Sequence, residues 1–449
     1  MIATIVQLLL VLGLMVLVHE LGHFVVAKLC GVRVETFAIG FGKRVVGLRR
    51  GGTEYQINIL PLGGYVKMAG EIPGEETTGD PGELNNHPRW QRMLIAVAGP
   101  ISNLALAFIL MTGAYMLHNE VNEYISGPAV TDYISPGSPV ARTGIHSGDT
   151  IVHFDSVENP TWDDVSQRAA LNLNQTVPFS FLDQGRRVDT SFFVASKEAP
   201  DDFIPGTLGF VPKMQSTPVK VSALLPGSPA ERAGLKPGDQ IVSIDALSVH
   251  SVPSLLAYMQ DQKGKPAVLS VLRNGQTLTL NVTPQLTDAD GTSAYRLGFQ
   301  PVFPPVKVEQ LSFAKSLAAS WDFNKKNSLL IKDVLKGMFE HHISVKSLAG
   351  PIGIGQIVHQ AAGMPGWMPL IGTMAMISIN LGIFNLLPIP ILDGGMIFFL
   401  LIESALGRDF PMQVKERVYQ VAFVCLILFA AMVIFNDITK LPYFAKLKS

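Results

Sequence analysis

His19, Glu20 and His23 form a His-Glu-x-x-His pattern, in which two imidazoles and one carboxylate can serve a single metal ion. Residues four apart share a face of a helix, so both imidazoles can bind one Zn²⁺. Glu20 is then placed beside the metal as a general base. So short a pattern also occurs in soluble helices, where the two histidines simply lie on the surface.

The surroundings of the motif decide between these readings. It follows Ile2–Val18, a run with almost no polar residue. One charged group at the centre of a membrane helix costs about 3 kcal/mol. Three ionisable side chains within a turn and a half therefore need a compensating partner, and a bound metal provides one.

The composition also indicates a membrane protein. Of the 449 residues, 48% are hydrophobic and 16% are charged, and the mean hydropathy is positive. These values are not those of an ordinary soluble domain. The net charge of -1 argues against a nucleic-acid partner, and Cys30 and Cys425 define no disulfide framework or zinc knuckle.

Four segments come close to the roughly 20 apolar residues that a bilayer requires. They are Ile5–Ala27, Met93–Leu117, Leu370–Leu387 and Val418–Phe435. The first lacks a basic start and a small-residue cleavage site, so it does not resemble a cleaved signal peptide. The sequence predicts an α-helical polytopic membrane protein with four transmembrane helices.

Basic residues in the short loops predict the orientation, since they favour the cytoplasmic side. The loop between the first two spans and the loop before the fourth are rich in them, whereas three lysines in the C-terminal tail oppose the trend slightly. The N-terminus, the C-terminus and the segment Asn119–Met368 are expected to be periplasmic. The basic residues are Lys28, Arg33, Lys43, Arg44, Arg49, Arg50, Lys67, Arg89 and Arg92, then Arg408, Lys415 and Arg417, and in the tail Lys440, Lys446 and Lys448.

The outward segment contains a repeat with an offset of about 90 residues. Pro136–Val152 and Pro226–Val242 share a Pro-Gly-Ser-Pro start and a Gly-Asp turn before an apolar strand. The pattern resembles PDZ domains, and Leu208–Phe210 and Leu297–Phe299 resemble the loop that holds a peptide carboxylate. Another duplicated β-rich module is the alternative. The assignment of each loop to a copy, and peptide binding by both copies, remain open.

An amphipathic helical region is expected after the repeat, over Leu311–His342. It lies at the outer membrane surface or packs against the PDZ-like pair. Its expected apolar side consists of Trp321, Phe323, Leu329, Leu330, Val334 and Phe339.

The second chemical motif is Asn385–Gly395, where two prolines followed by Asp-Gly-Gly break the helix. Unwound backbone at membrane depth must be buried in protein or line a wet cavity. Asp393 is the only acid between Leu370 and Leu401, and the predicted topology places it at the depth of the histidines. Two His and one carboxylate leave a catalytic Zn²⁺ one open position. The alternative for Asp393 is a helix N-cap, and both roles are compatible.

Together these features resemble the site-2 protease family of intramembrane zinc metalloproteases of the M50 type. The resemblance covers essentially the whole chain, including Gly40–Gly42, Pro61–Met68 and Asn436-Asp437. It implies zinc as cofactor, held by His19, His23 and Asp393, with Glu20 as catalytic base. It also implies that Asn380 and Asn385 help to hold the substrate.

The resemblance further implies a multi-pass protein of the bacterial inner membrane, with its active site toward the cytoplasm. The implied substrates are single-span membrane proteins already trimmed outside: an anti-sigma factor in the envelope stress response, and remnant signal peptides. The expected parts are 1–118 with two spans and the catalytic motif, 119–212 and 213–302 with PDZ-like domains, 303–368 with the helical region, and 369–449 with the last two spans.

A transmembrane substrate must unwind before its carbonyls can be attacked. Thr53–Leu60 and Tyr65–Met68, separated by Pro61–Gly64, are expected to form a hairpin whose edge captures the unwound chain by strand addition. Tyr65 belongs to this clamp, and Asn385 adds hydrogen bonds from the opposite side. An ordinary surface hairpin is the alternative.

Two other function classes are alternatives. A catalytically silent membrane scaffold would use its PDZ-like pair to bind periplasmic peptides, but a pseudoenzyme is expected to lack a ligand or the base, and here all are present. A zinc transporter would need a second set of intramembrane ligands, which the sequence lacks.

Overall fold

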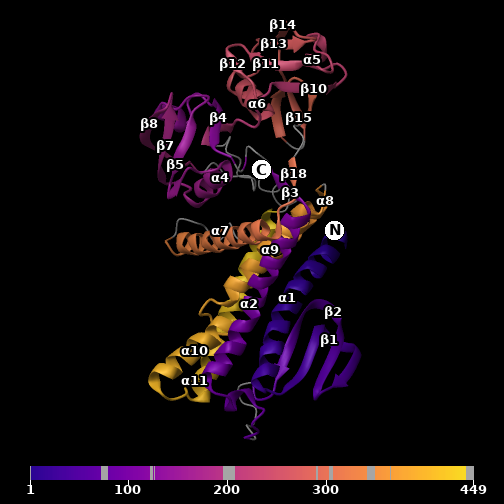
Figure 1. The fold of residues 1–449 in the computed structure, drawn as a ribbon, viewed down its shortest axis with the longest axis vertical. Helices are drawn as coiled ribbons and strands as arrows, with labels where there is room; N and C mark the ends of the chain where they lie inside the picture. Colours follow the sequence, from indigo (N-terminus) through magenta and orange to yellow (C-terminus); the bar gives the residue numbers. More distant parts are fainter. Residues whose placement is uncertain are drawn as a thin grey trace. The chain divides into compact units, whose positions relative to one another are not determined.

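The computed structural model describes residues 2–71, 79–121, 125, 127–195, 208–289, 292–302, 307–340, 349–364 and 366–440. The chain forms two compact units. Residues 1–119 and 309–449 make the first, which contains the long helices, and residues 120–308 make the second, which is rich in strands (Figure 1). Lys446, Lys448 and residues 341–348 of the expected helical region lie outside the described residues.

Four helices in the described part of the chain are long and apolar enough to cross a membrane, which confirms the four predicted spans. The third ends at Asn385, two residues earlier than predicted, because Pro388 and Pro390 follow at once and cannot continue a helix. The four helices are α1 (Ile2–Cys30), α2 (Arg89–Leu117), α9 (Met368–Asn385) and α11 (Met412–Lys440).

Helix α2 packs closely against both α1 and α9. Gly22 of α1 lies so near α2 that an added Cβ would be 2.5 Å from the carbonyl oxygen of Ala98. Gly382 of α9 is similar, with Pro100 O at 2.9 Å from the position of a Cβ. Small residues at such contacts let helix backbones approach, which is how membrane helices gain packing energy without a hydrophobic driving force.

A bent β-sheet lies against α1 (Figure 1). Its strands β1 (Val34–Arg50) and β2 (Thr53–Met68) are joined at Gly51 and Gly52, whose φ values of 58° and 80° suit the left-handed residues of a tight hairpin turn. The first half of β1 pairs on both sides, since Ala38 faces both Gln56 and Tyr65.

This register corrects the predicted hairpin. Thr53–Leu60 does not turn back directly onto Tyr65–Met68, because the first half of β1 lies between them. Two consecutive glycines form the tight turn, and β2 bends at its Pro61–Gly64 stretch, where Gly63 has a φ of 89°. Tyr65–Met68 is nevertheless an edge of the sheet among the described residues, on the side of α1.

The remaining helices of the first unit are α7 (Phe313–Phe339), α8 (Pro351–Gly363) and α10 (Asp393–Leu406). The main contacts of α7 are with α2 and α9, through small residues such as Ser316 and Ser320, and Thr112 of α2 donates a hydrogen bond to Ser320. Of the expected apolar side, Phe323 packs against α2 and α9, but Trp321 and Phe339 are 65% and 89% exposed. Small residues allow the closer approach, so they form the packed face.

The second unit contains two sheets of six strands with corresponding strand orders. The first has the order β8-β7-β5-β4-β9, with β6 on β5, and the second the order β14-β13-β11-β10-β17, with β12 on β11. The first comprises β4 (Ala129–Ile134), β5 (Thr150–Phe154), β6 (Val157–Glu158), β7 (Thr176–Asp183), β8 (Arg186–Phe193) and β9 (Phe210–Pro212), with helix α4 (Trp162–Leu171). The second comprises β10 (Val219–Leu224), β11 (Gln240–Ile244), β12 (Leu247–Ser248), β13 (Ala267–Arg273), β14 (Gln276–Val282) and β17 (Phe299–Val302), with helices α5 (Pro229–Arg232) and α6 (Val252–Asp261).

The structure assigns each Leu-Gly-Phe loop to its copy. The loop at Leu208–Phe210 leads into β9, which pairs with β4, and the loop at Leu297–Phe299 leads into β17, which pairs with β10. Gly209 and Gly298 have φ values of 92° and 78°, which explains the glycine in each loop. Two short pairs complete the strands: β15 (Gln285–Ala289) with β16 (Thr292–Arg296), and β3 (Asn119–Val121) with β18 (Lys307–Glu309).

Candidate metal centre

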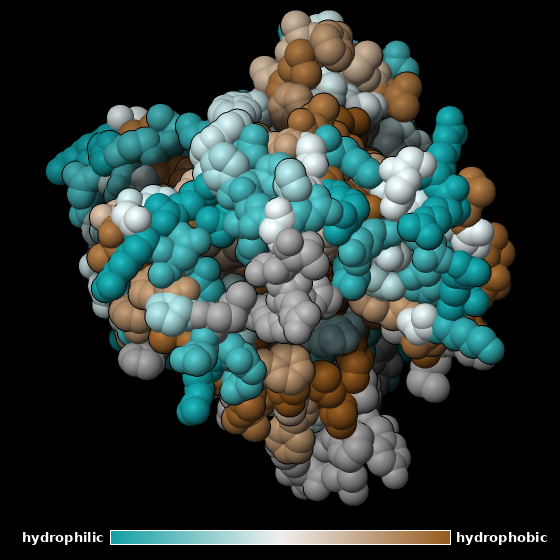
Figure 2. Space-filling model, turned by 90° about the horizontal axis from the view of Figure 1, so that it is seen from below, coloured by the Kyte–Doolittle hydropathy of each residue, from teal (hydrophilic) through white to brown (hydrophobic). Residues whose placement is uncertain are grey.

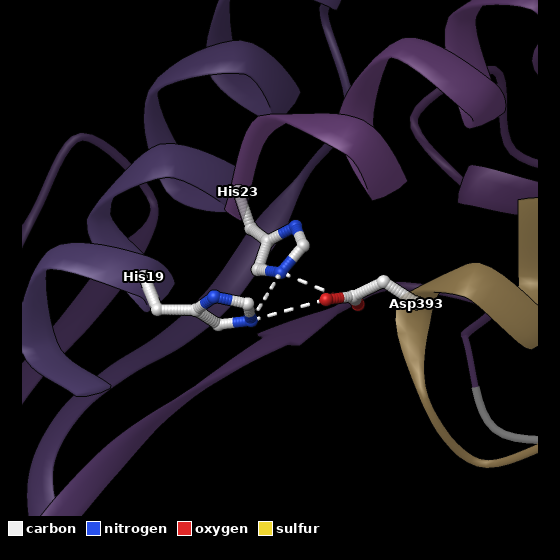
Figure 3. A group of neighbouring side chains, drawn as sticks. All are labelled: His19, His23 and Asp393. Atoms are coloured by element: carbon white, nitrogen blue, oxygen red, sulfur yellow. Dashed lines mark hydrogen bonds and ion pairs between the residues drawn. The ribbon is translucent and has the colours of Figure 1, made fainter. Parts of the chain in front are cut away.

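Two residues of α1 and the first residue of α10 converge at one point within the first unit (Figure 3). His19 and His23 are each 7% exposed and project from the same face of α1. Their Nε2 atoms lie 3.2 Å apart. Asp393 Oδ2 lies 3.1 Å from His19 Nε2, and Asp393 Oδ1 lies 3.4 Å from His23 Nε2.

These separations suit tetrahedral zinc. Bonds of about 2.0–2.2 Å place neighbouring ligand atoms of a tetrahedral Zn²⁺ about 3.3–3.5 Å apart. The two Nε2 atoms face each other, so their lone pairs repel when Nδ1 of each ring carries the proton. A cation between them removes that repulsion, and a donor set of two imidazoles and one carboxylate fits zinc.

The other nitrogen of each ring contacts α2. His23 Nδ1 lies 2.8 Å from the carbonyl oxygen of Ile95, an acceptor that favours the proton on Nδ1 and leaves Nε2 for a metal. His19 Nδ1 lies 3.2 Å from Asn103 Nδ2, while Asn103 Oδ1 is buried without a hydrogen-bond partner. Turning the amide by 180° lets Oδ1 accept a hydrogen bond from His19 Nδ1–H, since the nitrogen and oxygen of an amide exchange places in such a turn. Both imidazoles are then oriented by α2.

Asn103 and Gly99 of α2 lie beside the histidines, and the sequence analysis did not single them out. A Cβ at Gly99 would lie 2.2 Å from His23 Nε2 and 2.8 Å from His19 Cε1, so only glycine lets α2 pass this close to the rings. A signal existed for Asn103: it is one of only three polar residues in the second span, and a buried amide needs a partner.

Unwound backbone delivers the third member of the group. Leu386–Leu392 separates α9 from α10, and Ile391 has a φ of 92°, which is strained for a β-branched residue. Gly394 and Gly395 pack directly on the backbone of this turn, at distances that no Cβ allows. Leu392 is the N-cap of α10 and Asp393 its first helical residue, so the carboxylate of Asp393 faces the histidines and makes no side-chain cap.

Ion pairs secure the far end of α10. Glu403 is fully buried and lies 2.6 Å from Lys415 Nζ, while its Oε1 also accepts a hydrogen bond from the Phe410 N–H. Asp409 in the following loop accepts hydrogen bonds from Arg89 at the start of α2, at 2.6 and 2.9 Å. These contacts tie α10 to α2, the helix that orients both imidazoles.

Glu20 lies beside the group and touches the sheet. Its Oε2 accepts a hydrogen bond of 3.1 Å from the N–H of Val66, on the edge segment of β2. A cavity of about 350 Å³ opens at this place, lined by Glu20, both histidines and Asp393 together with Tyr65, Val66 and Asn385. The predicted base, the predicted ligands and the sheet edge therefore share one cavity.

Two of the three residues predicted to hold the substrate line the cavity, and the third does not. Asn385 lines the cavity, and its Nδ2 lies 3.4 Å from His19 Nε2. When His19 Nε2 binds a metal, it cannot accept a hydrogen bond from Asn385. The amide of Asn385 is then free for another partner. Tyr65 also lines the cavity, stacked on Phe41 with its hydroxyl 2.7 Å from Gln56 Nε2. Asn380 is half-buried on α9 and does not line the cavity.

The chain matches the family described as Peptidase family M50 over residues 7–429. It belongs to this family. Among curated proteins it is similar to the regulator of sigma-E protease RseP of Salmonella typhimurium, with 32% identity over 96% of this chain and 97% of the relative. RseP of Escherichia coli gives the same identity and coverage, and a putative zinc metalloprotease of Neisseria meningitidis is 30% identical over 95% and 97%.

Membership of family M50 gives the geometry its chemical meaning. The protein is a zinc metalloprotease, and its four apolar helices make it a multi-pass membrane protein. The donor set of His19 and His23 in α1 and Asp393 in α10 has surroundings that suit that metal.

Proposed function

We propose that this zinc metalloprotease cleaves the transmembrane segment of single-span proteins that have already been trimmed outside the membrane. The observation that carries the proposal is the position of the donor group: both histidines lie in α1, a helix long and apolar enough to span a membrane, beside a cavity that also contains Glu20. A protease cavity at that depth meets a peptide bond only when the substrate is itself in the membrane.

The residues of the site have three separate roles: metal binding, proton transfer and orientation of the imidazoles. His19, His23 and Asp393 would hold Zn²⁺, which supplies a Lewis acid for the scissile carbonyl and lowers the pKa of water. Glu20 accepts the proton of the attacking water and returns it to the leaving amine. Ile95 and Asn103 keep the imidazoles in the orientation and tautomer that this requires.

The edge of β2 at Tyr65–Met68 would capture the unwound substrate by strand addition. The Val66 N–H points out of this edge toward Glu20. A substrate strand that takes this N–H would release Glu20 Oε2 toward the water, so that capture and activation of the base coincide. Asn385, on the other side of the cavity, would donate to a substrate carbonyl, and Asn380 would support it from the same helix.

The names of the relatives support the biological setting. Proteins called regulators of sigma-E protease are similar to this chain along almost their whole length. We therefore assign the protein to a bacterial inner membrane, with an anti-sigma factor of the envelope stress response and remnant signal peptides as substrates. Both termini and the second unit would be periplasmic, and the cavity would face the cytoplasmic side.

The two sheets of the second unit would be PDZ-like domains that act as a size filter. They would exclude substrates that retain a bulky outer domain. Deleting residues 129–302 should then allow cleavage of an untrimmed substrate in cells while a trimmed substrate is still cut. If the untrimmed substrate stays intact and the trimmed one is processed normally, the filter is wrong.

The decisive experiment compares wild type with Glu20→Gln on a trimmed single-span substrate in reconstituted membranes. The amide cannot accept a proton, so turnover should fall about 10²–10⁴-fold while zinc per chain stays at the wild-type level. A variant that retains activity close to wild type would exclude Glu20 as the base. A wild-type enzyme that cuts only soluble peptides would contradict intramembrane cleavage.

A further inference from the structure

A second cavity lies between the end of α1 and the sheet. It has a volume of about 540 Å³ and is lined by Phe24, Lys28, Leu48, Arg50, Gly51 and Tyr55. None of these residues belongs to the proposed catalytic machinery. The lining combines two cations with three apolar or aromatic side chains and contains no acid.

Both cations lack a carboxylate partner among the described residues. Three basic groups of the same unit are each paired with a carboxylate: Arg33 with Asp80, Arg44 with Glu54, and Lys67 with Glu35. Lys28 instead lies over the ring of Phe24, with Nζ 5.9 Å from the centroid. Lys28 and Arg50 thus present positive charge to the cavity, and no carboxylate in the described part of the chain pairs with either.

The apolar wall of the cavity consists of packed rings and continues onto an exposed surface. The ring of Phe24 packs on those of Phe37 and Tyr55, with centroids 5.1 and 5.9 Å away. Leu48, at the outer segment of β1, is 66% exposed, and Val46 on the same segment is 62% exposed. In the view from below, hydrophilic and apolar patches lie next to each other at this end of the molecule (Figure 2).

The depth of the cavity is that of lipid headgroups. The first span covers Thr4–Cys30, so Lys28 lies in its last turn, at the boundary between hydrocarbon and water. Basic side chains at such a position attract anionic lipids, which give the cytoplasmic leaflet its negative surface potential. The distribution of basic residues predicts that this end of α1 is cytoplasmic.

We propose that this cavity binds one anionic phospholipid. Lys28 and Arg50 contact the phosphate, and an acyl chain lies along Phe24, Tyr55 and Leu48 toward the exposed valines of β1. The bound lipid joins α1 to the sheet whose opposite edge contacts Glu20. A free phosphate uses only the two cations and leaves the apolar walls uncovered.

The test is a lipid titration of the full chain in detergent, followed by native mass spectrometry, with phosphatidylglycerol as probe and phosphatidylcholine as the neutral comparison. Wild type should bind phosphatidylglycerol preferentially. Each of Lys28→Gln and Arg50→Gln should weaken it about fivefold, and both together about thirtyfold. Lys43→Gln is the matched control, because this exposed lysine of β1 lies outside the cavity and should leave affinity unchanged.

Further variants separate the remaining outcomes. The double change Lys28→Arg with Arg50→Lys keeps both charges and should keep the preference, which shows that loss in the neutral variants is not misfolding. Leu48→Ser should weaken the lipid but not inorganic phosphate. Equal binding of both lipids, loss in Lys43→Gln as large as in the double variant, or full displacement of the lipid by millimolar phosphate would overturn the proposal.

Discussion

Two groups of histidine and aspartate side chains in the described residues have ligand atoms within 4.8 Å of one another, yet their surroundings differ. His19, His23 and Asp393 lie among apolar helices, and outer contacts to α2 orient both imidazoles. His146, Asp149 and Asp183 lie at a turn of the first sheet, where the His146 side chain is 73% exposed. Short distances alone therefore do not make a metal centre: exposed side chains stay hydrated at little cost and need no metal, and oriented imidazoles are typical of real metal ligands.

The second sheet explains the exposed group. At the position that corresponds to Asp183, it has Arg273, whose Nε lies 2.7 Å from Asp239 in the equivalent Gly-Asp turn. Burial opposes ionisation of Asp239, but hydrogen bonds from Arg273 and the Lys236 N–H outweigh it and lower its pKa. Burial raises the pKa of Asp149; the His146 N–H opposes the rise and the charge of Asp183 adds to it. In the first copy, therefore, no arginine neutralises Asp149, because Asp183 occupies the position of Arg273.

Removing one carboxylate from each group should produce the largest contrast. Asp393→Ala should lose most of its zinc and fall in activity by more than the roughly 10–100-fold that an outer partner costs, whereas Asp183→Ala should keep both. Asp393→Asn should fold and bind metal more weakly. Zinc per chain, measured by elemental analysis after dialysis, checks this, and full zinc in Asp393→Ala would remove Asp393 from the ligand set.

The second-largest effect should come from crowding the rings of His19 and His23. Gly99→Ala places a methyl group within 2.2 Å of the unshifted His23 Nε2, so the ring must move. A misplacement of about 1 Å in a catalytic group costs about 10²-fold in rate. Gly113→Ala is the control in the same helix, because nothing lies within 4 Å of its Cβ. Equal activity of the two variants would show that α2 does not confine the rings.

The outer contact of His19 should matter less than the ligand itself. Asn103→Ala should weaken zinc binding about 10–100-fold, because His19 loses the partner of its Nδ1. Ser102→Ala, which loses only a hydrogen bond to Ala98 O in the same helix, should change little. Competition with a chelator measures both affinities. Unchanged affinity in Asn103→Ala would mean that Ile95 and packing suffice to orient the imidazoles.

The smallest effect concerns the exposed group. Asp183→Arg should reproduce the pairing of Arg273 and stabilise the chain by about 1 kcal/mol at neutral pH. A lowered pKa for Asp149 contributes stability above the ordinary aspartate pKa of about 3.9, and that stability is lost as the pH falls through the folded pKa. Thermal unfolding should therefore show a gain at neutral pH that disappears in acid. A gain that persists in acid would come from another contact.

Local patterns were sufficient to predict several features. The spacing of His19 and His23 places them on one helix face whatever the rest of the chain does, because helical periodicity is local. Long apolar runs predicted four spans for the same reason, since the bilayer sets their length. The prolines before Asp393 predicted the break between α9 and α10, because proline cannot donate within a helix.

Tertiary structure decided what depends on contacts between distant segments. The sequence contains no local signal that Val66 donates to Glu20, that Asn103 adjoins His19, or that the first half of β1 separates the two halves of β2. Such contacts arise from how helices and strands pack, and packing depends on the shapes of both partners at once. Local sequence spacing identified the candidate ligands and base, and the packing of α2 and the sheet against α1 determined their surroundings.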